Sequence, residues 1–523
     1  MKGKTLQVDG NHLRLEDVAL FVSDSSFKLR VSPVALIRVR ASHSFVANEL
    51  GERVVYGVNT GFGPMASFMI GPDKLVTLQY NLVRSHASGI GNPLPERYVA
   101  AAMIVRLNTL LRGYSGVSEE LIHKLVLFLN RRIFPVVPEH GAVGTSGDLV
   151  QLAHIALALI GEGEVLHEGK RQATAKVLQK LGILPHVLLP KEGLSLINGT
   201  SLMSGIGALG VLHAERLLSL ALRAGALALE SVSAYSDGIL SELHELRPHS
   251  GQKEAARVLR ELVRASEFLR DRARLSKRSR AGVEHINDDV QEFYSFRCIP
   301  QILGPVLDTI RNARGVLQIE INSVTDNPIV DVANKKFLHG GNFHGEYVAT
   351  ALDEMKAGLV KLTMLSERRT NYFLHAKINH RFPPFLNMDT PGLTLALQGL
   401  QFVSTSTTAL SQTYAFPHRV HSIPTNNDNQ DLVSMGADAA LLFMKVVEQA
   451  YIVLGIELVS LCQTVDILKG EQKLSESSRE LYRAVRAIIP PVIQDRPLSL
   501  ELQSLISFLQ NTERFDISFR LSS

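Results

Sequence analysis

The amino-acid sequence predicts a mainly α-helical fold with a long central bundle of helices. Apolar residues recur at helical spacing over long stretches of the chain, whereas runs that alternate as strands do are few and short. So many long helical patterns indicate an extended bundle. Because 523 residues exceed a single typical core, we expect at least two packed regions. The long patterns lie at about 205–234, 251–275, 303–324, 345–376, 394–412, 431–466 and 476–488.

Composition and charge are those of an ordinary globular protein. Hydrophobic residues make up 45% of the chain and charged residues 20%, and the formal net charge is only +4. That small excess of positive charge predicts no particular partner. The two cysteines, Cys298 and Cys462, show no Cys/His spacing typical of zinc, which argues against a disulfide framework and against a structural metal site.

The sequence shows no sign of export or of a membrane span. Its first sixteen residues lack a basic stretch followed by an apolar run, so no signal peptide is visible. The most apolar helical pattern, 205–234, includes five charged or titratable residues, too many for a membrane span. We therefore expect a soluble, cytoplasmic protein. The five residues are His213, Glu215, Arg216, Arg223 and Glu230.

The first fifty residues predict a small sheet followed by a helix. Residues 5–8 and 12–15 alternate between apolar and polar side chains, which suggests short or edge strands. Residues 33–50 have helical spacing, with Ser32 as the expected cap. Pro33 suits the first helical position because its missing N–H costs nothing there.

Two segments then carry residues that can take part in chemistry. Residues 54–64 hold three glycines and a proline, so they can form a loop that folds closely over a ligand. As a dinucleotide fingerprint this loop is weak, because no helix directly follows its glycines. Its Tyr56 would, by residue type alone, more often be a packed aromatic. In residues 79–89, His86 follows Ser85, and a lone histidine is usually a satisfied core or surface residue.

The most informative stretch is Gly141–Ala153. It follows two prolines that break regular structure and leads into an apolar helical run, 149–160. Asp148 stands where an N-cap or first-turn acid belongs. The tripeptide Thr145-Ser146-Gly147 is therefore expected in a tight turn at a helix N-terminus, with glycines supplying unusual backbone angles. The stretch has neither the phosphate-loop pattern nor the Gly-x-Ser-x-Gly nucleophile elbow.

Further along, four polar or aromatic positions have ordinary interpretations when each is taken alone. Asn198 could simply cap the helix that follows it. Arg297 would by default form a surface ion pair, although a planar guanidinium also suits a carboxylate. Three-residue spacing would bring Gln291, Tyr294 and Arg297 onto neighbouring surface of a helix. Phe343 would more often be plain core, and residues 426–435, with Gln430, a polar turn before a helix.

A basic run favours a solvated helix end over a nucleic-acid site. Acidic residues interleave with it at Glu261, Glu267 and Asp271, and no recognition motif accompanies it. We therefore expect no nucleic-acid partner. The basic residues are Arg264, Arg270, Arg272, Arg274, Lys277, Arg278 and Arg280.

Together these well-separated segments resemble the histidine, phenylalanine and tyrosine ammonia-lyases and their aminomutase relatives, and most of all the bacterial tyrosine ammonia-lyases. The resemblance spans essentially the whole chain. It implies a mainly α fold of the fumarase/aspartase-like superfamily, with a mixed N-terminal domain over residues 1–200 and a helical bundle over residues 201–523. It also implies a homotetramer whose active sites combine loops from several subunits.

The resemblance implies a prosthetic group made from the chain itself, and no metal. In this family an Ala-Ser-Gly tripeptide condenses into 4-methylidene-imidazole-5-one (MIO). The glycine nitrogen attacks the carbonyl two residues back, and the serine loses water to leave an electrophilic methylene. Here the group would form from Thr145-Ser146-Gly147, with Ser146 giving the methylene. Thr145 stands in place of the usual alanine, and its side chain would only decorate the edge of the ring.

By the same resemblance each site residue acquires a role. Tyr56 would be the catalytic base, although a free phenol is a poor base at neutral pH and the site would have to assist it. Arg297 would bind the substrate carboxylate, with Gln291 in the same motif, and Tyr294 would assist near the prosthetic group. Gly63 would border the substrate, Asn198 would lie beside the ring and the substrate amine, and Phe343 would pack near the ring.

The substrate expected from the resemblance is L-tyrosine, giving trans-4-coumarate and ammonia. Ser85 and His86 match positions around the far end of the substrate side chain, and a histidine there can bind a phenol hydroxyl or an imidazole. Gln430 stands where histidine ammonia-lyases carry a glutamate, which counts against histidine. Three alternatives remain: a urocanate-forming histidine ammonia-lyase, a tyrosine 2,3-aminomutase, and an inactive helical scaffold.

Overall fold

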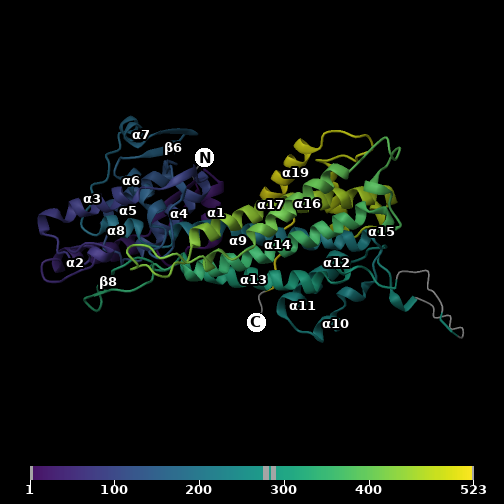
Figure 1. Ribbon diagram of the computed structural model, residues 1–523, viewed down its shortest axis with the longest axis horizontal. Helices are drawn as coiled ribbons and strands as arrows, with labels where there is room; N and C mark the ends of the chain where they lie inside the picture. The colour runs from purple at the N-terminus through teal and green to yellow at the C-terminus, as the bar shows by residue number, and fades with distance from the viewer. Residues whose placement is uncertain (1–3, 275–281, 284–289, 521–523) are drawn as a thin grey trace. The chain divides into compact units, whose positions relative to one another are not determined.

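The computed structural model describes residues 4–274, 282–283 and 290–520 and consists mostly of helices with a few short strands (Figure 1). Its residues form two compact units. The first unit runs to Leu212 and also takes in Ala313–Asp353 and Pro417–Leu442; the second contains the described residues of His213–Asn312, Glu354–Phe416 and the chain from Phe443 onwards. This division is distinct from the domain boundary expected between residues 200 and 201, which stays a prediction.

The first unit surrounds the segments that carry the candidate site. Its helices are α1 (Leu15–Ser23), α2 (Pro33–Glu49), α3 (Leu75–His86), α4 (Glu96–Leu111), α5 (Glu119–Asn130), α6 (Leu149–Leu159), α7 (Thr174–Leu181) and α8 (Glu192–Ile197). Nearly every residue of α4 is buried, from Tyr98 to Leu111, so this helix forms the centre of the unit. An apolar helix that is covered on all sides gives no amphipathic period, and the sequence did not predict it.

Four small sheets among the described residues complete the first unit. The parallel pair β1 (Lys4–Val8) and β2 (Phe27–Val31) joins the N-terminal segment to residues after α1. The antiparallel pairs are β3 (Ile90–Pro93) with β5 (Pro138–His140), and β8 (Ile329–Asp331) with β9 (Lys336–Leu338). A three-stranded sheet has the order β4 (Phe134–Pro135), β6 (Glu164–His167) and β7 (Lys170–Ala173).

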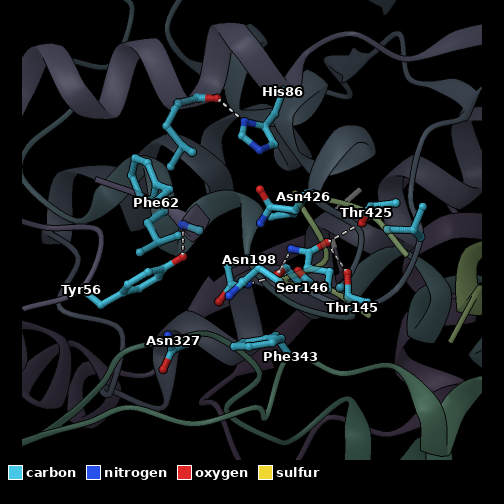
Figure 2. A pocket seen from close by; sticks show the side chains of 18 of the residues that line it. Tyr56, Phe62, His86, Thr145, Ser146, Asn198, Asn327, Phe343, Thr425 and Asn426 are labelled. Carbon is cyan, nitrogen blue, oxygen red and sulfur yellow. Dashed lines mark hydrogen bonds between the residues drawn. The ribbon is translucent and has the colours of Figure 1, made fainter. Parts of the chain in front are cut away.

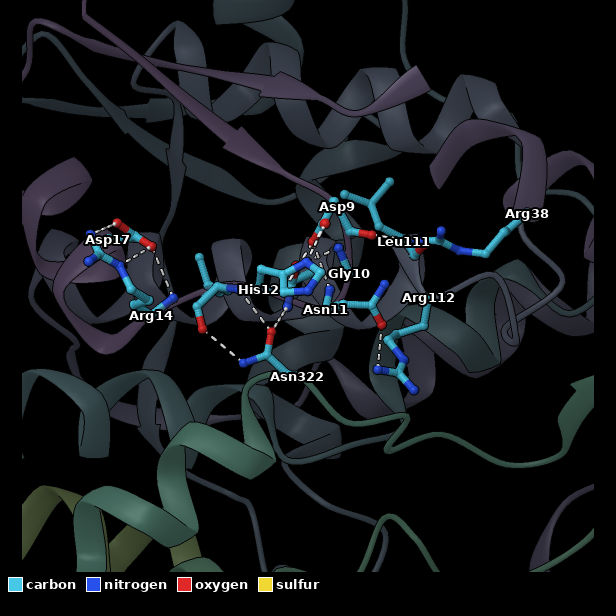
Figure 3. A network of polar contacts seen from close by, with 12 residues as sticks. Asp9, Gly10, Asn11, His12, Arg14, Asp17, Arg38, Leu111, Arg112 and Asn322 are labelled. Carbon is cyan, nitrogen blue, oxygen red and sulfur yellow. Dashed lines mark hydrogen bonds and ion pairs between the residues drawn. The ribbon is translucent and has the colours of Figure 1, made fainter. Parts of the chain in front are cut away.

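The strand predicted at residues 12–15 is wrong, because Leu15 begins α1. The carboxylate of Asp17 accepts the backbone N–H of Arg14 at 3.0 Å, which satisfies an otherwise free donor at the helix start (Figure 3). Asn322 holds Leu13, the residue before Arg14, in the loop: it accepts the N–H of Leu13 at 2.9 Å and donates to its carbonyl at 2.8 Å. A partner 309 residues away therefore overrides the local alternation.

Four long helices are divided between the units: α9 (Ser201–Ser231), α13 (Ile299–Glu320), α14 (Glu346–Leu374) and α17 (Gly436–Leu468). Within the second unit, Thr464 of α17 donates to Ser231 of α9 at 2.9 Å, and the buried Arg369 of α14 pairs with Glu457 of α17. The remaining helices of this unit are α10 (Ser241–Glu245), α11 (Ser250–Leu262), α12 (Tyr294–Arg297), α15 (Ala376–Asn379), α16 (Gln398–Tyr414), α18 (Glu476–Arg486) and α19 (Ser499–Asn511).

The seven long helical patterns all correspond to helices, but several boundaries differ. The pattern at 251–275 ends as α11 at Leu262, and Ala265 then takes a φ of +61°. In the basic run beyond it, Arg270 and Arg272 lie over the ring of Tyr235 at 4.1 and 4.4 Å. Residue 275 and the predicted basic residues Lys277, Arg278 and Arg280 lie outside the described residues.

Two of the described helices, α9 and α17, are long and apolar enough to cross a membrane by length and composition alone. However, 78% and 67% of their most apolar stretches are buried within the structure. This degree of burial is typical of core helices, which pass the same test of length and composition.

Candidate active site

The tripeptide Thr145-Ser146-Gly147 lies in a turn that only glycine can form at two positions. Gly144 and Gly147 have φ angles of +79° and +71°. A Cβ on Gly147 would lie 2.0 Å from the carbonyl oxygen of Gly199, and a Cβ on Gly144 would lie 2.1 Å from Ser434 Oγ. The expectation that glycines supply unusual backbone angles here is therefore confirmed, and the close approach to Gly199 adds a second reason for them.

The loop before α9 forms hydrogen bonds with the tripeptide segment. The carbonyl oxygen of Ser146 accepts hydrogen bonds from the amide nitrogen of Asn198 at 3.1 Å and from the N–H of Gly199 at 3.3 Å. Gly199 in turn accepts the N–H of Asp148 at 2.8 Å. Asn198 is buried, and its Oδ1 has no hydrogen-bond partner in the structure. Asn198 therefore fixes the turn and keeps one acceptor available beside it.

A second loop, residues 425–435, holds the tripeptide from another direction. Thr145 Oγ1 donates to Gln430 Oε1 at 2.6 Å, and Gln430 Nε2 donates to Ser146 Oγ at 3.0 Å (Figure 2). Thr425 also donates to Gln430 Oε1, at 3.2 Å. The side chain at position 430 therefore contacts both the first and the second residue of the tripeptide.

Asp148 occupies the predicted N-cap position of α6, but its side chain does not cap this helix. Its carboxyl makes no hydrogen bond to α6 and instead accepts the N–H groups of Leu202 and Met203, at 2.8 and 3.0 Å, at the start of α9. Burial raises the pKa of Asp148 to about 7, although these two donors and the nearby Arg106 act in the opposite direction. One side chain thus links the N-termini of two helices behind the tripeptide.

Tyr56 lies on the glycine-rich loop with its phenol oxygen held by that same loop. The N–H of Gly63 donates to Tyr56 Oη at 3.0 Å, and the ring packs edge-on against Phe62 at a centroid distance of 6.3 Å. Gly63 has a φ of +53°, and a Cβ there would lie 2.5 Å from the amide of Asn426. At Gly63 the loop therefore lies so close to residues 425–435 that any larger side chain there would clash with Asn426.

One cavity of about 1100 Å³ in the first unit gathers most of the predicted site residues. This volume is ample for a single amino acid. Figure 2 shows Thr145, Ser146, Tyr56 and His86 around it. The predicted residues that line it are Tyr56, Gly63, Ser85, His86, Thr145, Ser146, Gly147, Asn198, Phe343 and Gln430.

His86 is held in one tautomer at the edge of the cavity. Its Nδ1 lies 2.9 Å from the carbonyl oxygen of Leu82, which can only accept, so the proton resides on Nδ1. A neutral His86 therefore presents Nε2 as a hydrogen-bond acceptor. In Figure 2 its ring points into the cavity from the side opposite Phe343.

Gln291, Tyr294 and Arg297 lie in the second unit and are not among the residues that line this cavity. Arg297 donates to Gln291 Oε1 at 3.0 Å, and its guanidinium lies 4.6 Å from the ring centroid of Tyr294. Arg297 therefore contacts both other side chains, but Gln291 precedes α12 (Tyr294–Arg297), so the predicted common helix face is wrong. Tyr294 is 67% exposed in the single chain.

Comparison with known proteins decides the family. The family model of the aromatic amino acid lyases matches residues 13–487 of the chain. The chain belongs to the aromatic amino acid lyase family. It is a carbon–nitrogen lyase of the ammonia-lyase type, and the predicted membership and mainly α fold are confirmed.

Relatives of this lyase match it from end to end. It is 37% identical to a histidine ammonia-lyase of Stigmatella aurantiaca over 514 residues, which cover 98% of each chain. Among solved structures, the tyrosine aminomutase of Streptomyces globisporus is 35% identical, with a TM-score of 0.93 over 99% of this chain and 100% of the other. The histidine ammonia-lyase of Trypanosoma cruzi is 31% identical, with a TM-score of 0.87 over 99% of each chain.

The residues of the lyase fit the MIO group known for this family. The tripeptide turn has no room for a Cβ at Gly147, and the buried Asn198 holds the Ser146 carbonyl that would belong to the ring. Among the described residues, no group of three or more His, Cys, Asp or Glu side chains could hold a metal ion.

Several residues of the lyase line the cavity although the sequence did not single them out. Thr425 directly precedes the polar turn at residues 426–435, Asn426 is the first residue of that turn, and His339 lies four residues before Phe343. His339 Nε2 accepts the backbone N–H of Tyr56 at 3.4 Å, and burial lowers the pKa of His339. Asn327 also lines the cavity, and no sequence motif marked it.

Proposed function

We propose that this lyase eliminates ammonia from L-tyrosine to give trans-4-coumarate, using an MIO group formed from Thr145-Ser146-Gly147. The observation that carries the proposal is the cavity that joins Tyr56, the tripeptide and the Nε2 acceptor of His86. The MIO group would supply an electrophile that makes the substrate amine a better leaving group. The surrounding side chains would bind the substrate and remove the proton.

Each side chain has a distinct task in this proposal. Tyr56 takes a proton from the β-carbon. The N–H of Gly63 donates to the phenol oxygen that accepts this proton, and so it stabilises negative charge on that oxygen before the transfer. His86 Nε2 accepts the substrate hydroxyl at the far end of the cavity. Arg297 binds the substrate carboxylate with its planar fork, and Tyr294 assists near the prosthetic group. Asn198 holds the tripeptide and lies near the substrate amine.

The absence of a carboxylate at position 430 supports tyrosine over histidine. The Gln430 amide carries no charge to offer an imidazole ring, and it already bonds to Thr145, Thr425 and Ser146. The S. globisporus structure, similar over the whole chain, is named a tyrosine aminomutase. This name gives tyrosine independent support.

Histidine is the second candidate, and the names of the curated relatives favour it over tyrosine. Relatives at 35–39% identity are named histidine ammonia-lyases. His86 Nε2 could also accept an N–H of an imidazole. A tyrosine aminomutase remains the third candidate, because retention of the intermediate by the loop that carries Tyr56 would favour readdition of ammonia.

We further propose a cytoplasmic homotetramer with shared active sites. Arg297 and Tyr56 belong to different compact units, and the family resemblance assigns both to one site. Loops from several subunits would bring such residues together. The partner is an aromatic amino acid, without nucleic acid or membrane.

Supplying tyrosine, histidine and phenylalanine separately to the purified protein, with products identified by chromatography and mass, tests the assignment. Coumarate with one equivalent of ammonia from tyrosine is the expected result. Urocanate as the dominant product would replace tyrosine with histidine, and β-tyrosine would identify a mutase. No product from any of the three would contradict the proposed activity.

A further inference from the structure

The carboxamide of Gln430 is held by two threonine hydroxyls at once. Thr145 Oγ1 and Thr425 Oγ1 both donate to its Oε1, at 2.6 and 3.2 Å. A carbonyl oxygen has two lone pairs, so this acceptor is fully used. The NH₂ group of the same amide is thereby directed to Ser146 Oγ, at 3.0 Å.

Thr145 contributes the shorter of the two bonds from inside the tripeptide itself. The residue is only 4% exposed, so water does not readily replace its hydroxyl. An alanine at this position would leave Gln430 Oε1 with Thr425 alone, and the terminal torsion of glutamine has broad, roughly two-fold minima. The amide could then turn its oxygen toward Ser146. In the observed arrangement the Thr145 hydroxyl donates, and so it helps to hold the amide with its NH₂ group toward Ser146.

We propose that Thr145 is a positioning residue for the maturation of this lyase, because it orients Gln430 so that its NH₂ donates to the Ser146 hydroxyl as that hydroxyl leaves. The inference rests on the proposed MIO group. In this proposal the side chain of Thr145 does more than occupy the edge of the ring, and Gln430 acts before any substrate binds.

The chemistry of this step balances with two molecules of water as the only products released. In ring closure a bond forms between Gly147 N and the carbonyl carbon of Thr145, and the carbonyl oxygen leaves as water with the protons of two backbone nitrogens. In the second loss, the Cα proton of Ser146 departs and its electron pair forms the C=C bond. Oγ leaves as hydroxide and takes up a proton to become water. A donor at Oγ stabilises the charge that develops there.

The two loops are docked independently of the Thr145 side chain. Met435 N–H donates to the Val143 carbonyl at 3.0 Å, and Ser434 Oγ donates to the Gly144 carbonyl at 3.0 Å. Loss of the Thr145 hydroxyl therefore removes one bond to Gln430 and leaves these contacts in place. The effect on maturation can be separated from a loss of structure.

Time-resolved intact-protein mass after a short pulse of cell-free synthesis measures the maturation directly. Thr145→Val keeps the shape and removes the hydroxyl, Thr145→Ser restores it, and Thr77→Val makes the same exchange at an exposed position of α3. We expect the rate of water loss to fall about fivefold in Thr145→Val, the effect of one lost hydrogen bond. Thr145→Ser and Thr77→Val should stay near the wild-type rate.

Gln430→Met provides a second variant, because a thioether of similar length cannot donate to Ser146 Oγ. We expect this variant to mature at least about fivefold more slowly even with Thr145 present. It still tests the proposal if Thr145→Val does not fold. A wild-type rate of water loss in Gln430→Met, or in a folded Thr145→Val, would overturn this proposal but would leave the proposed MIO group intact. A wild-type chain that never loses two waters would overturn both.

Discussion

The backbone N–H of Gly63 donates a hydrogen bond to the phenol oxygen of Tyr56 across 3.0 Å. Both residues belong to one loop, so the loop itself positions the proposed base. The bond also directs a donor at the oxygen on which negative charge would reside. Gly63 itself has a left-handed φ of +53°, a conformation that glycine adopts without strain.

Tyr56→Phe keeps the ring and its edge-on packing against Phe62 but removes the proposed base. We expect kcat to fall by about 10²–10⁴, the usual contribution of a positioned base, while the melting temperature stays close to that of the wild type. Steady-state kinetics and a thermal melt check this. Retention of more than a tenth of the wild-type kcat would remove Tyr56 from the role of base.

Gly63→Ala should disturb the same bond through the backbone. A left-handed backbone costs an L-residue about 1–2 kcal/mol, and the new Cβ would meet the amide of Asn426 at 2.5 Å. We expect kcat to fall about tenfold or more as the phenol oxygen shifts. Gly51→Ala is the matched control, because a Cβ there meets nothing within 4 Å. Equal kcat values in the two variants would contradict the importance of the loop geometry.

Asp148 is expected to make stability depend on pH. Because burial raises its pKa to about 7, the folded state keeps the proton while the unfolded state releases it near the ordinary value of 3.8. Unfolding therefore releases a proton between about pH 4 and pH 7, and the contribution of Asp148 to stability is lost as the pH rises through that window. Asp148→Asn, which retains an acceptor for Leu202 and Met203, should show a shallower fall in melting temperature.

Asp148→Ala separates the acceptor from the charge. It would leave two buried N–H groups at the start of α9 without partners, at a cost of about 1–3 kcal/mol each. We expect this variant to melt below Asp148→Asn at every pH. Parallel pH profiles for the wild type and Asp148→Asn would show that Asp148 does not titrate in this range.

The sequence predicted the long helices because their buried stripes recur at helical spacing, but it could not place their ends. The pattern at 394–412 begins as α16 only at Gln398, because the carboxylate of Asp495 accepts the N–H groups of Leu395 and Ala396. The pattern at 431–466 begins as α17 at Gly436, after Met435 takes a φ of +52°. Partners a hundred residues away set such boundaries.

The candidate site was predictable where glycine-rich motifs marked it, as at Gly63 and Gly147. It was not predictable where a contact depends on the fold. The carboxyl of Asp148 reaches α9 instead of its own helix, and Asn327 enters the cavity from a segment without any motif. The hydrogen bond between Thr145 and Gln430 joins residues 285 apart in the sequence, so no local pattern predicts it.

His86→Leu tests how the substrate hydroxyl is recognised. The variant removes the Nε2 acceptor that the Leu82 carbonyl holds in place. We expect kcat/KM for tyrosine to fall about ten- to a hundredfold, because a hydroxyl would lose its partner in a desolvated site. The value for phenylalanine, which has no hydroxyl, should stay level or rise. An unchanged ratio of tyrosine to phenylalanine activity would contradict the role of His86.

Mixing two inactive variants tests whether Tyr56 and Arg297 meet across a subunit boundary. Tyr56→Phe lacks the proposed base, and Arg297→Gln lacks the carboxylate clamp, so each alone should be nearly inactive. If a site takes Tyr56 from one subunit and Arg297 from another, co-expression creates some sites with both wild-type residues, and activity returns to about a quarter of the wild-type level for random assembly. Co-expression of Tyr56→Phe with Tyr56→Phe, Arg297→Gln is the control, since no mixture of those chains contains Tyr56. Activity no higher in the first mixture than in this control would place both residues in the same chain's site.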